Sequence, residues 1–256
     1  MIHRVLDSGT PAGIAPDLCA LGVMTKAPRS GEVKTRLVPP LTHLEAAQLN
    51  RSFLRDIAAA ICETVGEKLA CGVGIYTPLG TETVYEGILP AEFFLIPQRG
   101  NHFGDRLIFA AEDLFRVGFT SVCLINSDSP TVPSKSFSQA VELLRPPGDR
   151  VVLGPSDDGG YYLIGMKKVH RELFEDVDWS TERVLQQTRR RGAEIGLEVE
   201  LLPVGYDVDD RATLRRLCEE LLGENSPDGL APHTRAFLDG IIAREGRERI
   251  WPRLVK

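Results

Sequence analysis

The stretch SVCLINSDSP, residues Ser121 to Pro130, joins an apolar run to an acidic side chain. Its first seven residues are typical of a buried β-strand, and Pro130 cannot continue one. A carboxylate at the end of an apolar strand is costly to desolvate unless a cation or a hydrogen-bond donor meets it. We therefore expect Asp128 to mark a binding site at the carboxyl edge of a sheet.

Strand-like and helix-like segments alternate on both sides of this stretch. Apolar runs predict strands at residues 18–24, 70–76, 93–96, 121–127, 151–153, 161–166 and 197–202. Helical spacing of apolar residues predicts helices at about 43–61, 103–117, 137–144, 182–191, 212–222 and 234–244. Thr42 and Glu45 form a capping-box pattern at the start of the first helix. The alternation predicts an α/β fold with a mostly parallel central sheet.

The 256 residues suffice for one large α/β domain with a full core. Residues 1–17 are rich in Gly and Pro and predict a flexible leader. The main domain is expected at 18–222, followed by a helical extension at 223–256 that packs on the same domain. The chain therefore divides into a leader, one domain and an extension.

Charge and hydropathy restrict the partners of this chain. The net charge of −6 disfavours general affinity for nucleic acid or anionic membranes. No run of about 18 apolar residues predicts a membrane span, so we expect a cytoplasmic protein without integral membrane contact. The expected partners are small molecules, and whether the chain forms a homodimer is left open.

The loop after the first predicted strand, KAPRSGEVKTR at residues 26–36, carries four cations and a glycine. Exposed amides with Lys and Arg suit phosphate oxygens, so the loop predicts a polyphosphate site. Val33 stands where a Walker A motif needs Gly before Lys-Thr, which excludes that motif. The alternative is a solvated basic loop without function.

A second acidic site, Asp207 and Asp209, follows the last predicted strand. These carboxylates should share a sheet edge with Asp128, and together they would suit Mg²⁺ or Mn²⁺. The alternative is that Asp209 or Asp210 only caps the helix that follows.

Three further segments are weaker candidates. Residues 154–162, GPSDDGGYY, hold a glycine turn and two tyrosines that could pack on a sugar or base, although a plain β-hairpin has the same composition. The loop at 98–106, with Gln98, Gly104 and Arg106, could hold a base or ribose. Trp179-Ser180-Thr181 is better explained as a hydrophobic anchor followed by a helix cap.

In this order the segments KAPRSGEVKTRL, NSDSP, GPSDDGGYYLIGM, FEDVDWST and DVD, with Gln98, Gly104 and Arg106 between the first two, resemble a known family. The chain is similar to bacterial glycosyltransferase-A-type nucleotide-diphospho-sugar transferases over residues 18–222. The nearest branch is the arsenosugar-biosynthesis glycosyltransferases, and phospholactate and molybdenum-cofactor guanylyltransferases are more distant. The resemblance implies a three-layer Rossmann-like fold, a nucleotide donor and a divalent metal.

The resemblance also assigns roles by position. It implies Asp128 as the principal metal ligand, completed by Asp209 and Asp207. Asp210 stands where the family usually has Thr, which makes this second metal position less secure. The implied nucleotide and pocket contacts are Lys26, Gly31, Lys34, Arg36, Gln98, Gly104, Arg106, Gly159, Gly160 and Tyr161.

The chemistry expected is transfer from a nucleotide-activated donor. Bound metal and neighbouring Lys or Arg, with Lys34 and Asp128 as the principal groups, would stabilise charge on the departing phosphate. For glycosyl transfer, Asp157 or Asp158 is the candidate base, with Asp158 preferred. The alternatives are nucleotidyl transfer from a nucleoside triphosphate with release of pyrophosphate, and a nucleotide-binding module without turnover.

Overall fold

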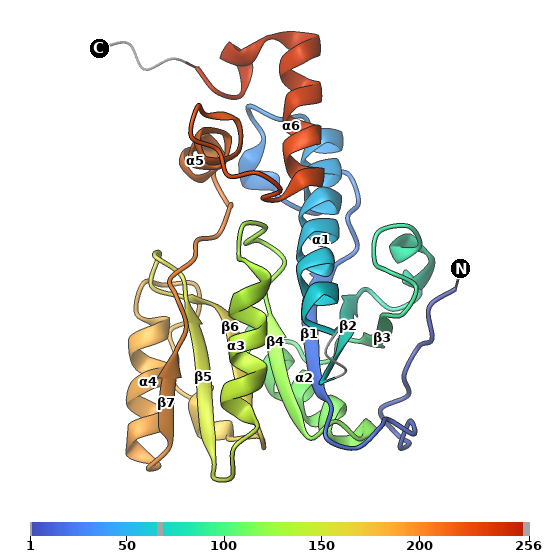
Figure 1. Cartoon of the computed structure of the whole chain (residues 1–256), viewed down its shortest axis with the longest axis vertical. Helices are drawn as coiled ribbons and strands as arrows, with labels where there is room; N and C mark the ends of the chain where they lie inside the picture. The colour runs from blue at the N-terminus through green and yellow to red at the C-terminus, as the bar shows by residue number, and fades with distance from the viewer. Residues whose placement is uncertain (1, 66–68, 253–256) are drawn as a thin grey trace.

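The computed structural model describes residues 2–65 and 69–252, and its centre is a single seven-stranded sheet (Figure 1). The strand order is β3-β2-β1-β4-β6-β5-β7. The strands are β1 (Cys19–Lys26), β2 (Ala70–Thr77), β3 (Phe94–Pro97), β4 (Ser121–Ile125), β5 (Arg150–Pro155), β6 (Tyr161–Met166) and β7 (Glu198–Leu201). Only β6 runs antiparallel to its two neighbours. The predicted α/β fold with a mostly parallel sheet is confirmed.

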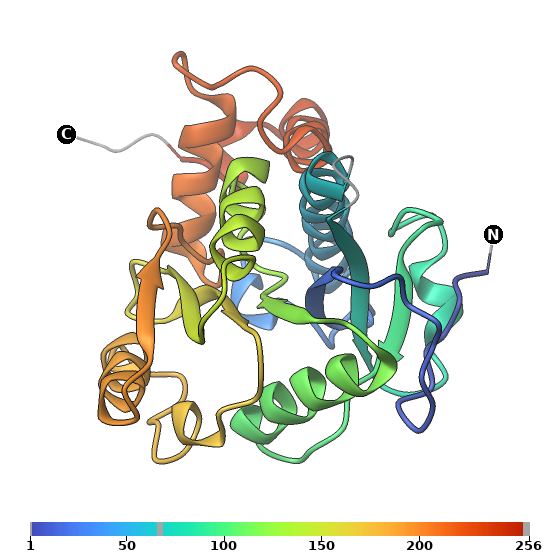
Figure 2. The ribbon, with the colours of Figure 1, turned by 60° about the horizontal axis from the view of Figure 1, so that its bottom comes forward.

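Helices cover both faces of this sheet. The α-helices of the described ranges are α1 (His43–Val65), α2 (Phe103–Val117), α3 (Ser134–Leu144), α4 (Val184–Glu194), α5 (Arg211–Leu222) and α6 (Pro232–Glu245), and the last two lie beyond one end of the sheet (Figure 1). Buried residues of α1 and α3 form one apolar cluster with the sheet, and those of α2 form a second cluster on the opposite face (Figure 2). The predicted three-layer arrangement follows from these two cores.

The central strand β1 shows why the sequence builds two cores. Successive side chains of a strand point to opposite faces, and Cys19, Leu21 and Val23 join the α1 and α3 cluster while Ala20 joins the α2 cluster. A strand flanked by parallel neighbours and covered by helices on both faces is apolar throughout, as the run CALGVM is.

The start of α1 confirms the predicted capping box. The Thr42 amide donates to Glu45 Oε2 at 2.8 Å, and the Glu45 amide donates to Thr42 Oγ1 at 3.2 Å. Arg249 Nη1, from the C-terminal end of the chain, also donates to Glu45 Oε1 at 2.9 Å. Burial opposes the charge of Glu45, but these partners lower the pKa of its carboxyl to about 2.

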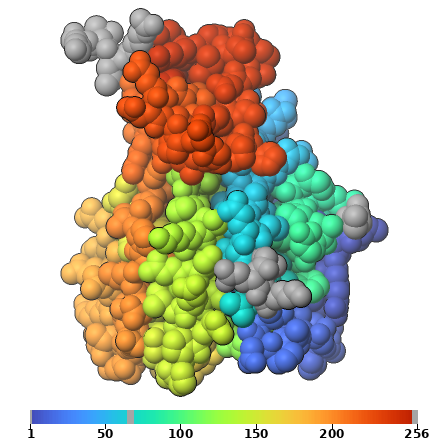
Figure 3. Space-filling model, in the orientation of Figure 1, coloured from blue at the N-terminus to red at the C-terminus, as the bar shows by residue number. Residues whose placement is uncertain are grey.

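The helices α5 and α6 gather at one end of the molecule (Figure 3). Together with the first half of α1 they enclose a third apolar cluster. The buried Asp56 carboxylate of α1 accepts hydrogen bonds from the amides of His233 and Thr234 and so caps the start of α6. The predicted extension at 223–256 includes residues 253–256, which lie outside the described residues.

The N-terminal segment differs from the expectation of a loose leader. The Leu6 amide donates to the Leu95 carbonyl at 2.7 Å, and the Leu95 amide donates to the Arg4 carbonyl at 3.0 Å. His3 is buried, with its ring nitrogens 3.1 Å from the Phe93 carbonyl and 3.3 Å from the Tyr85 carbonyl. Residues 3–6 therefore lie along the edge strand β3, while Met1 lies outside the described residues.

Candidate functional site

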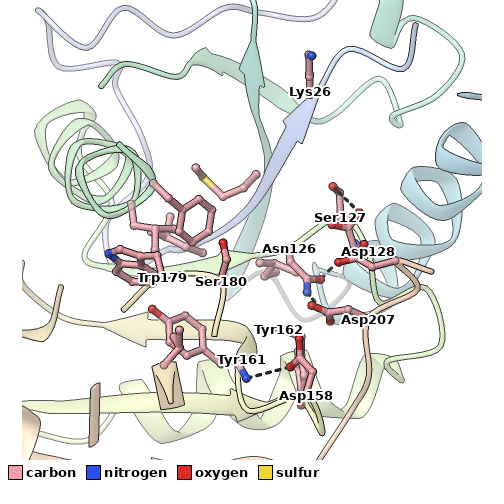
Figure 4. Close-up of a pocket in the computed structure, with 18 of the residues that line it drawn as sticks. Lys26, Asn126, Ser127, Asp128, Asp158, Tyr161, Tyr162, Trp179, Ser180 and Asp207 are labelled. Atoms are coloured by element: carbon pink, nitrogen blue, oxygen red, sulfur yellow. Dashed lines mark hydrogen bonds between the residues drawn. The ribbon is translucent and has the colours of Figure 1, made fainter. Parts of the chain in front are cut away.

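A cavity of about 790 Å³ opens where β1 and β4 end and β6 begins (Figure 4). Its lining comes from the loop at 26–36, from α1 and the first turn of α2, and from segments 126–128, 158–164, 179–184 and 207–209. The cavity thus lies at the carboxyl edge of the parallel strands, where the sequence predicts the site. Asp128, Asp207 and Asp209 all line it.

Four charged residues form what we call the polar wall of this cavity: Lys34, Asp128, Asp207 and Asp209. Lys34 Nζ lies 2.6 Å from Asp128 Oδ1 and 2.9 Å from Asp209 Oδ1. The Lys34 side chain is only 5% exposed. Burial opposes its charge, but the two carboxylates outweigh this effect and raise the pKa of Lys34 above its usual value. Residues 175 positions apart thus share one ion-pair network.

Backbone contacts bring the two acidic segments together. The Val208 amide donates to the Asp128 carbonyl at 2.9 Å. The Val208 carbonyl accepts a hydrogen bond from Lys34 Nζ at 2.8 Å. The predicted meeting of Asp128 with Asp209 therefore rests on main-chain bonds as well as on charge. Asp210 instead caps α5, because its side chain accepts from the Thr213 amide.

Asp207 is the most enclosed carboxylate of the polar wall. Its Oδ1 accepts hydrogen bonds from Asn126 Nδ2 at 2.8 Å, Ser129 Oγ at 2.6 Å and Ser156 Oγ at 2.9 Å. Burial nevertheless raises the pKa of Asp207 above its usual value, and the nearby Asp128 adds to the rise. Three donors on one oxygen fix this carboxylate in place.

The polar wall fits a metal that arrives together with a phosphate ligand. Within residues 2–65 and 69–252, no three His, Cys, Asp or Glu side chains are grouped as a ready-made metal cage. Mg²⁺ is usually held by one or two carboxylates plus substrate phosphates, and Asp128 and Asp209 supply such oxygens. In this structure Lys34 forms ion pairs with both carboxylates. A metal at these residues stays a prediction.

The basic loop at 26–36 contributes differently from the expectation. Lys34 is bound to carboxylates, so the loop cations that line the cavity and stay exposed are Lys26 and Arg36. Lys26 Nζ donates to the Glu32 carbonyl at 3.1 Å. Gly31, with φ +79°, lies outside the lining.

Three predicted site residues of the loop at 98–106 make structural contacts, although Phe103 of the same segment lines the cavity. Gln98 Nε2 donates to the Thr25 carbonyl at 3.1 Å and to the Ile75 carbonyl at 2.7 Å, and so ties β1 to β2. Arg106 Nε reaches the Gly100 carbonyl at 3.4 Å. Gln98, Gly104 and Arg106 do not line the cavity, and this placement does not support the predicted nucleotide contacts.

The glycine turn divides its predicted residues between two roles. Asp158, Gly160 and Tyr161 line the cavity, and the Gly160 amide donates to Asp158 Oδ1 at 2.9 Å. Gly159 lies outside the lining and packs against the backbone of residue 182, where an added Cβ would come within 2.1 Å of a carbonyl oxygen. Asp157 pairs with Arg216 instead. Of the two candidate bases, Asp158 is the one at the cavity.

Four lining residues form a second surface, which we call the aromatic wall: Phe103, Tyr161, Trp179 and Ser180. Tyr161, Trp179 and Ser180 lie across the cavity from Asp128 and Asp207 (Figure 4). The sequence predicted Tyr161 as a pocket contact but did not reveal Phe103. The Phe103 and Trp179 rings meet edge to face with centroids 5.1 Å apart. The sequence favours a hydrophobic anchor and a helix cap for Trp179-Ser180-Thr181. Trp179 does pack against the apolar cluster of α2, but Trp179 and Ser180 also line the cavity ahead of α4, which begins at Val184. The sequence feature that could have indicated this wall is Trp179 followed by the hydroxyl residues Ser180 and Thr181.

A second residue that the sequence did not reveal is Asn50 of α1. It lines the cavity and is only 4% exposed. Its Oδ1 has no hydrogen-bond partner within the described part of the chain. A buried polar atom without a partner is costly, so Asn50 is a candidate contact for a polar ligand group.

Comparisons with known proteins agree with this geometry. Residues 64–181 match a family described as "Uncharacterized protein conserved in bacteria (DUF2064)". A candidate nucleotide-diphospho-sugar transferase from Desulfovibrio desulfuricans G20 is 28% identical with a TM-score of 0.76, and the match covers 91% of this chain and 99% of that one. A search of curated proteins found no significant match.

Two nucleotidyltransferases share the fold at lower identity. CMP:2-keto-3-deoxy-manno-octonic acid synthetase, solved with CTP, is 12% identical with a TM-score of 0.52, over 81% of this chain and 99% of that one. A cytidylyltransferase from Leptospira borgpetersenii serovar Hardjo-bovis (strain JB197) is 10% identical with a TM-score of 0.50, over 94% of this chain and 99% of that one. The predicted nucleotide-diphospho-sugar transferase fold and the enzyme class, a transferase, are confirmed. The arsenosugar branch stays a prediction.

No helix in the described ranges combines the length and hydrophobicity that a membrane crossing requires.

Proposed function

We propose that this chain is a metal-dependent glycosyltransferase that moves a sugar from a nucleotide-diphospho-sugar to a small acceptor. The observation that carries the proposal is the contact of Lys34 with both Asp128 and Asp209 inside the cavity. A cation and acidic side chains at the carboxyl edge of the sheet are the groups that a diphosphate and its Mg²⁺ or Mn²⁺ require.

The residues divide the work according to charge. Lys26 and Arg36, exposed at the cavity, would bind the diphosphate oxygens. Asp128 and Asp209, with Asp207 beside them, would hold the divalent cation. When bound, that cation would stabilise the negative charge that develops on the departing diphosphate. Lys34 would hold the carboxylates in position and add its own positive charge.

Asp158 is the proposed general base for the acceptor. Its carboxylate lines the cavity, and its Oδ1 is held by the Gly160 amide at 2.9 Å. A base must lie within hydrogen-bond reach of the hydroxyl that it deprotonates. The neighbouring Asp157 pairs with Arg216 and does not line the cavity, which favours Asp158.

Nucleotidyl transfer is the second candidate, because cytidylyltransferases share this fold. That reaction would use the same basic loop and acidic residues, with a phosphorylated acceptor attacking the α-phosphorus of a nucleoside triphosphate.

A mass-spectrometric assay separates the candidates. The full chain with Mn²⁺ is offered nucleotide sugars and nucleoside triphosphates, each with a mixture of glycosides and sugar phosphates as acceptors. We expect nucleoside diphosphate and a heavier glycosylated acceptor. Pyrophosphate release from a triphosphate, with the nucleotide sugars unchanged, would establish nucleotidyl transfer instead. Tight nucleotide binding without any product would identify a binding module.

The role of Asp128 is tested separately by calorimetry with UDP and GDP in the presence of Mn²⁺. Asp128→Asn should weaken binding of whichever nucleotide the protein prefers, because it removes a charged oxygen ligand. Asp239→Asn, at an exposed position of α6, is the matched control. Equal binding by Asp128→Asn and the control would refute the metal role.

A further inference from the structure

We propose that the aromatic wall is an acceptor subsite for an uncharged, hydroxyl-bearing molecule with an apolar ring face. This inference rests on the proposed function, because it assigns the second substrate of the same cavity. Phosphorylated or otherwise anionic acceptors would be disfavoured there. Glycosides with an apolar substituent and aromatic alcohols are the chemical class that fits.

The first observation is an aromatic surface that stays uncovered. The Phe103 side chain is 51% exposed at the start of α2. Trp179 packs against it and is backed by Phe174, whose ring stacks at 6.5 Å with an interplanar angle of 19°. Exposed aromatic rings inside a concave site are typical contacts for planar or apolar ligand faces.

The second observation is that glycines hold this wall in place. An added Cβ at Gly104 would come within 2.8 Å of Trp179 Nε1, so the indole packs directly on the backbone of α2. On the other side, the Gly159 carbonyl accepts from the Leu185 amide at 2.8 Å and fixes the segment that carries Ser180. A subsite held by backbone contacts is organised before the ligand arrives.

The third observation is the distribution of charge. The cations that line the cavity within the described residues are Lys26, Lys34 and Arg36, and all three belong to one loop. The segments on the other side contribute the carboxylates Asp158 and Glu182 instead. A phosphate group placed on the aromatic wall would meet negative charge without a compensating cation.

The fourth observation concerns a hydroxyl group. Ser180 has φ +65°, a backbone conformation that is uncommon for a residue with a side chain. Its side chain lies between Trp179 and Asn126 in the close-up view (Figure 4). No hydrogen bond to the Ser180 hydroxyl is made within the described residues, so it can bind a ligand hydroxyl.

The transfer step balances with these groups. The acceptor oxygen forms a bond to the anomeric carbon of the donor, while the bond from that carbon to the diphosphate oxygen breaks. The electron pair of the broken bond stays on the nucleoside diphosphate. The hydroxyl proton passes to the carboxylate of Asp158.

Tryptophan fluorescence tests the subsite without any turnover. The chain has two tryptophans, and Trp251→Phe leaves Trp179 as the reporter. The probes are phenyl β-D-glucopyranoside, methyl β-D-glucopyranoside, which lacks the ring, and phenyl phosphate, which adds charge. We expect a saturable change with phenyl glucoside, at an affinity about tenfold higher than for either of the other probes, which equals about 1.4 kcal/mol.

Variants in the same background locate the binding. Phe103→Ala should weaken phenyl glucoside binding about tenfold. Leu79→Ala, at a side chain that is 77% exposed in another loop, should leave binding unchanged. Glu182→Lys should narrow the difference in affinity between phenyl glucoside and phenyl phosphate, because it adds a cation where the described lining residues carry only carboxylates.

The inference is overturned if phenyl phosphate binds as tightly as phenyl glucoside, or if Phe103→Ala and Leu79→Ala bind alike. Calorimetry with UDP and GDP separates this failure from failure of the proposed function. Nucleotide binding without phenyl glucoside binding would refute the acceptor subsite and leave the proposed function standing. Phenyl glucoside binding without nucleotide binding would refute the proposed function and show only that the aromatic wall binds an apolar ligand.

Discussion

The polar wall and the aromatic wall face each other across one cavity, but different forces organise them. In the polar wall each charge has a partner: Lys34 holds Asp128 and Asp209, while three donors hold Asp207. In the aromatic wall the contacts are packing between rings and glycine backbones. Ion pairs and hydrogen bonds therefore organise the polar wall, whereas packing organises the aromatic wall.

This difference predicts different responses to substitution. Loss of one charge in the polar wall leaves its partner unbalanced, so the effect should appear in turnover. Loss of packing in the aromatic wall should appear in stability and acceptor binding, with nucleotide binding preserved.

The largest expected effect is that of Lys34→Met. Removing the ammonium leaves Asp128 and Asp209 as unbalanced like charges beside the diphosphate, and transferase activity should fall by at least about a hundredfold. The measurement is the initial rate of nucleoside diphosphate release. Lys135→Met, at an exposed position of α3, is the control and should retain activity. Equal rates for the two variants would show that the polar wall has no catalytic role.

The second largest effect is expected from Gly159→Ala, which changes the backbone contact that supports the aromatic wall. Gly159 has φ +89°, and an added Cβ would lie 2.1 Å from the Glu182 carbonyl oxygen, which is main chain and cannot move aside. Gly159→Ala should lower the free energy of unfolding by more than about 3 kcal/mol, measured by urea denaturation.

Gly80→Ala separates backbone conformation from this clash. Gly80 has φ +83°, but nothing lies within 4 Å of an added Cβ. Its cost should stay near 1–2 kcal/mol, roughly that of the left-handed backbone alone. An equal loss in both variants would mean that the contact with residue 182 does not matter.

Acid should lower the stability of α1, the helix that packs against Lys34 of the polar wall. Phe53 of α1 lies beneath Lys34, with Nζ 5.5 Å from the ring centroid, and Glu45 holds the start of that helix. The pKa of Glu45 is lowered from 4.5 to about 2. Its stabilising contribution is therefore present above pH 4.5 and is lost as the pH falls toward 2, with a total of up to about 3 kcal/mol.

Equilibrium unfolding between pH 5 and pH 2 measures this contribution. Glu45→Gln should be less stable than the parent at pH 6 and should lose less stability on acidification. Glu245→Gln is the matched control, because Glu245 also contacts Arg249 but is largely exposed. Parallel pH profiles for the parent and Glu45→Gln would contradict the expectation.

The smallest effect is expected from Gly104→Ala. The new Cβ would press on the Trp179 indole at 2.8 Å, although the helix itself favours Ala. Binding of phenyl glucoside should weaken by roughly fivefold, about 1 kcal/mol, with nucleotide binding unchanged. Gly240→Ala in α6, where only the end of Arg244 is near, should leave both unchanged. A loss of nucleotide binding in Gly104→Ala would contradict the expectation that the two walls bind different substrates.

The sequence predicted the polar wall but only part of the aromatic wall, for a physical reason. Charged residues at strand ends are rare in a core, so Asp128 and Asp209 were recognisable from position alone. Phe103 was not, because an apolar residue looks the same whether it fills a core or lines a pocket, and for the same reason Trp179 was interpreted as an anchor. The expected strand and helix positions were close to those observed, since periodicity reports burial directly.

Pairings between distant segments were also beyond the sequence. Arg99 Nε donates to Asp113 Oδ2 at 2.7 Å, which ties the start of the loop at 98–106 to α2. Lys34 is a predicted phosphate contact, and the sequence did not show that its ammonium also pairs with two carboxylates. Composition shows which groups are charged, and only the fold decides which of them neutralise each other.

The N-terminal residues along β3 have a practical consequence for handling this protein. The main-chain bonds between Leu6, Arg4 and Leu95 occupy the β3 edge of the sheet, and an unpaired edge strand is prone to pair with strands of other molecules. Deletion of residues 1–6, for example to fuse a tag closer to the core, would expose the edge of β3. Such a shortened chain should self-associate on concentration, and light scattering would detect it.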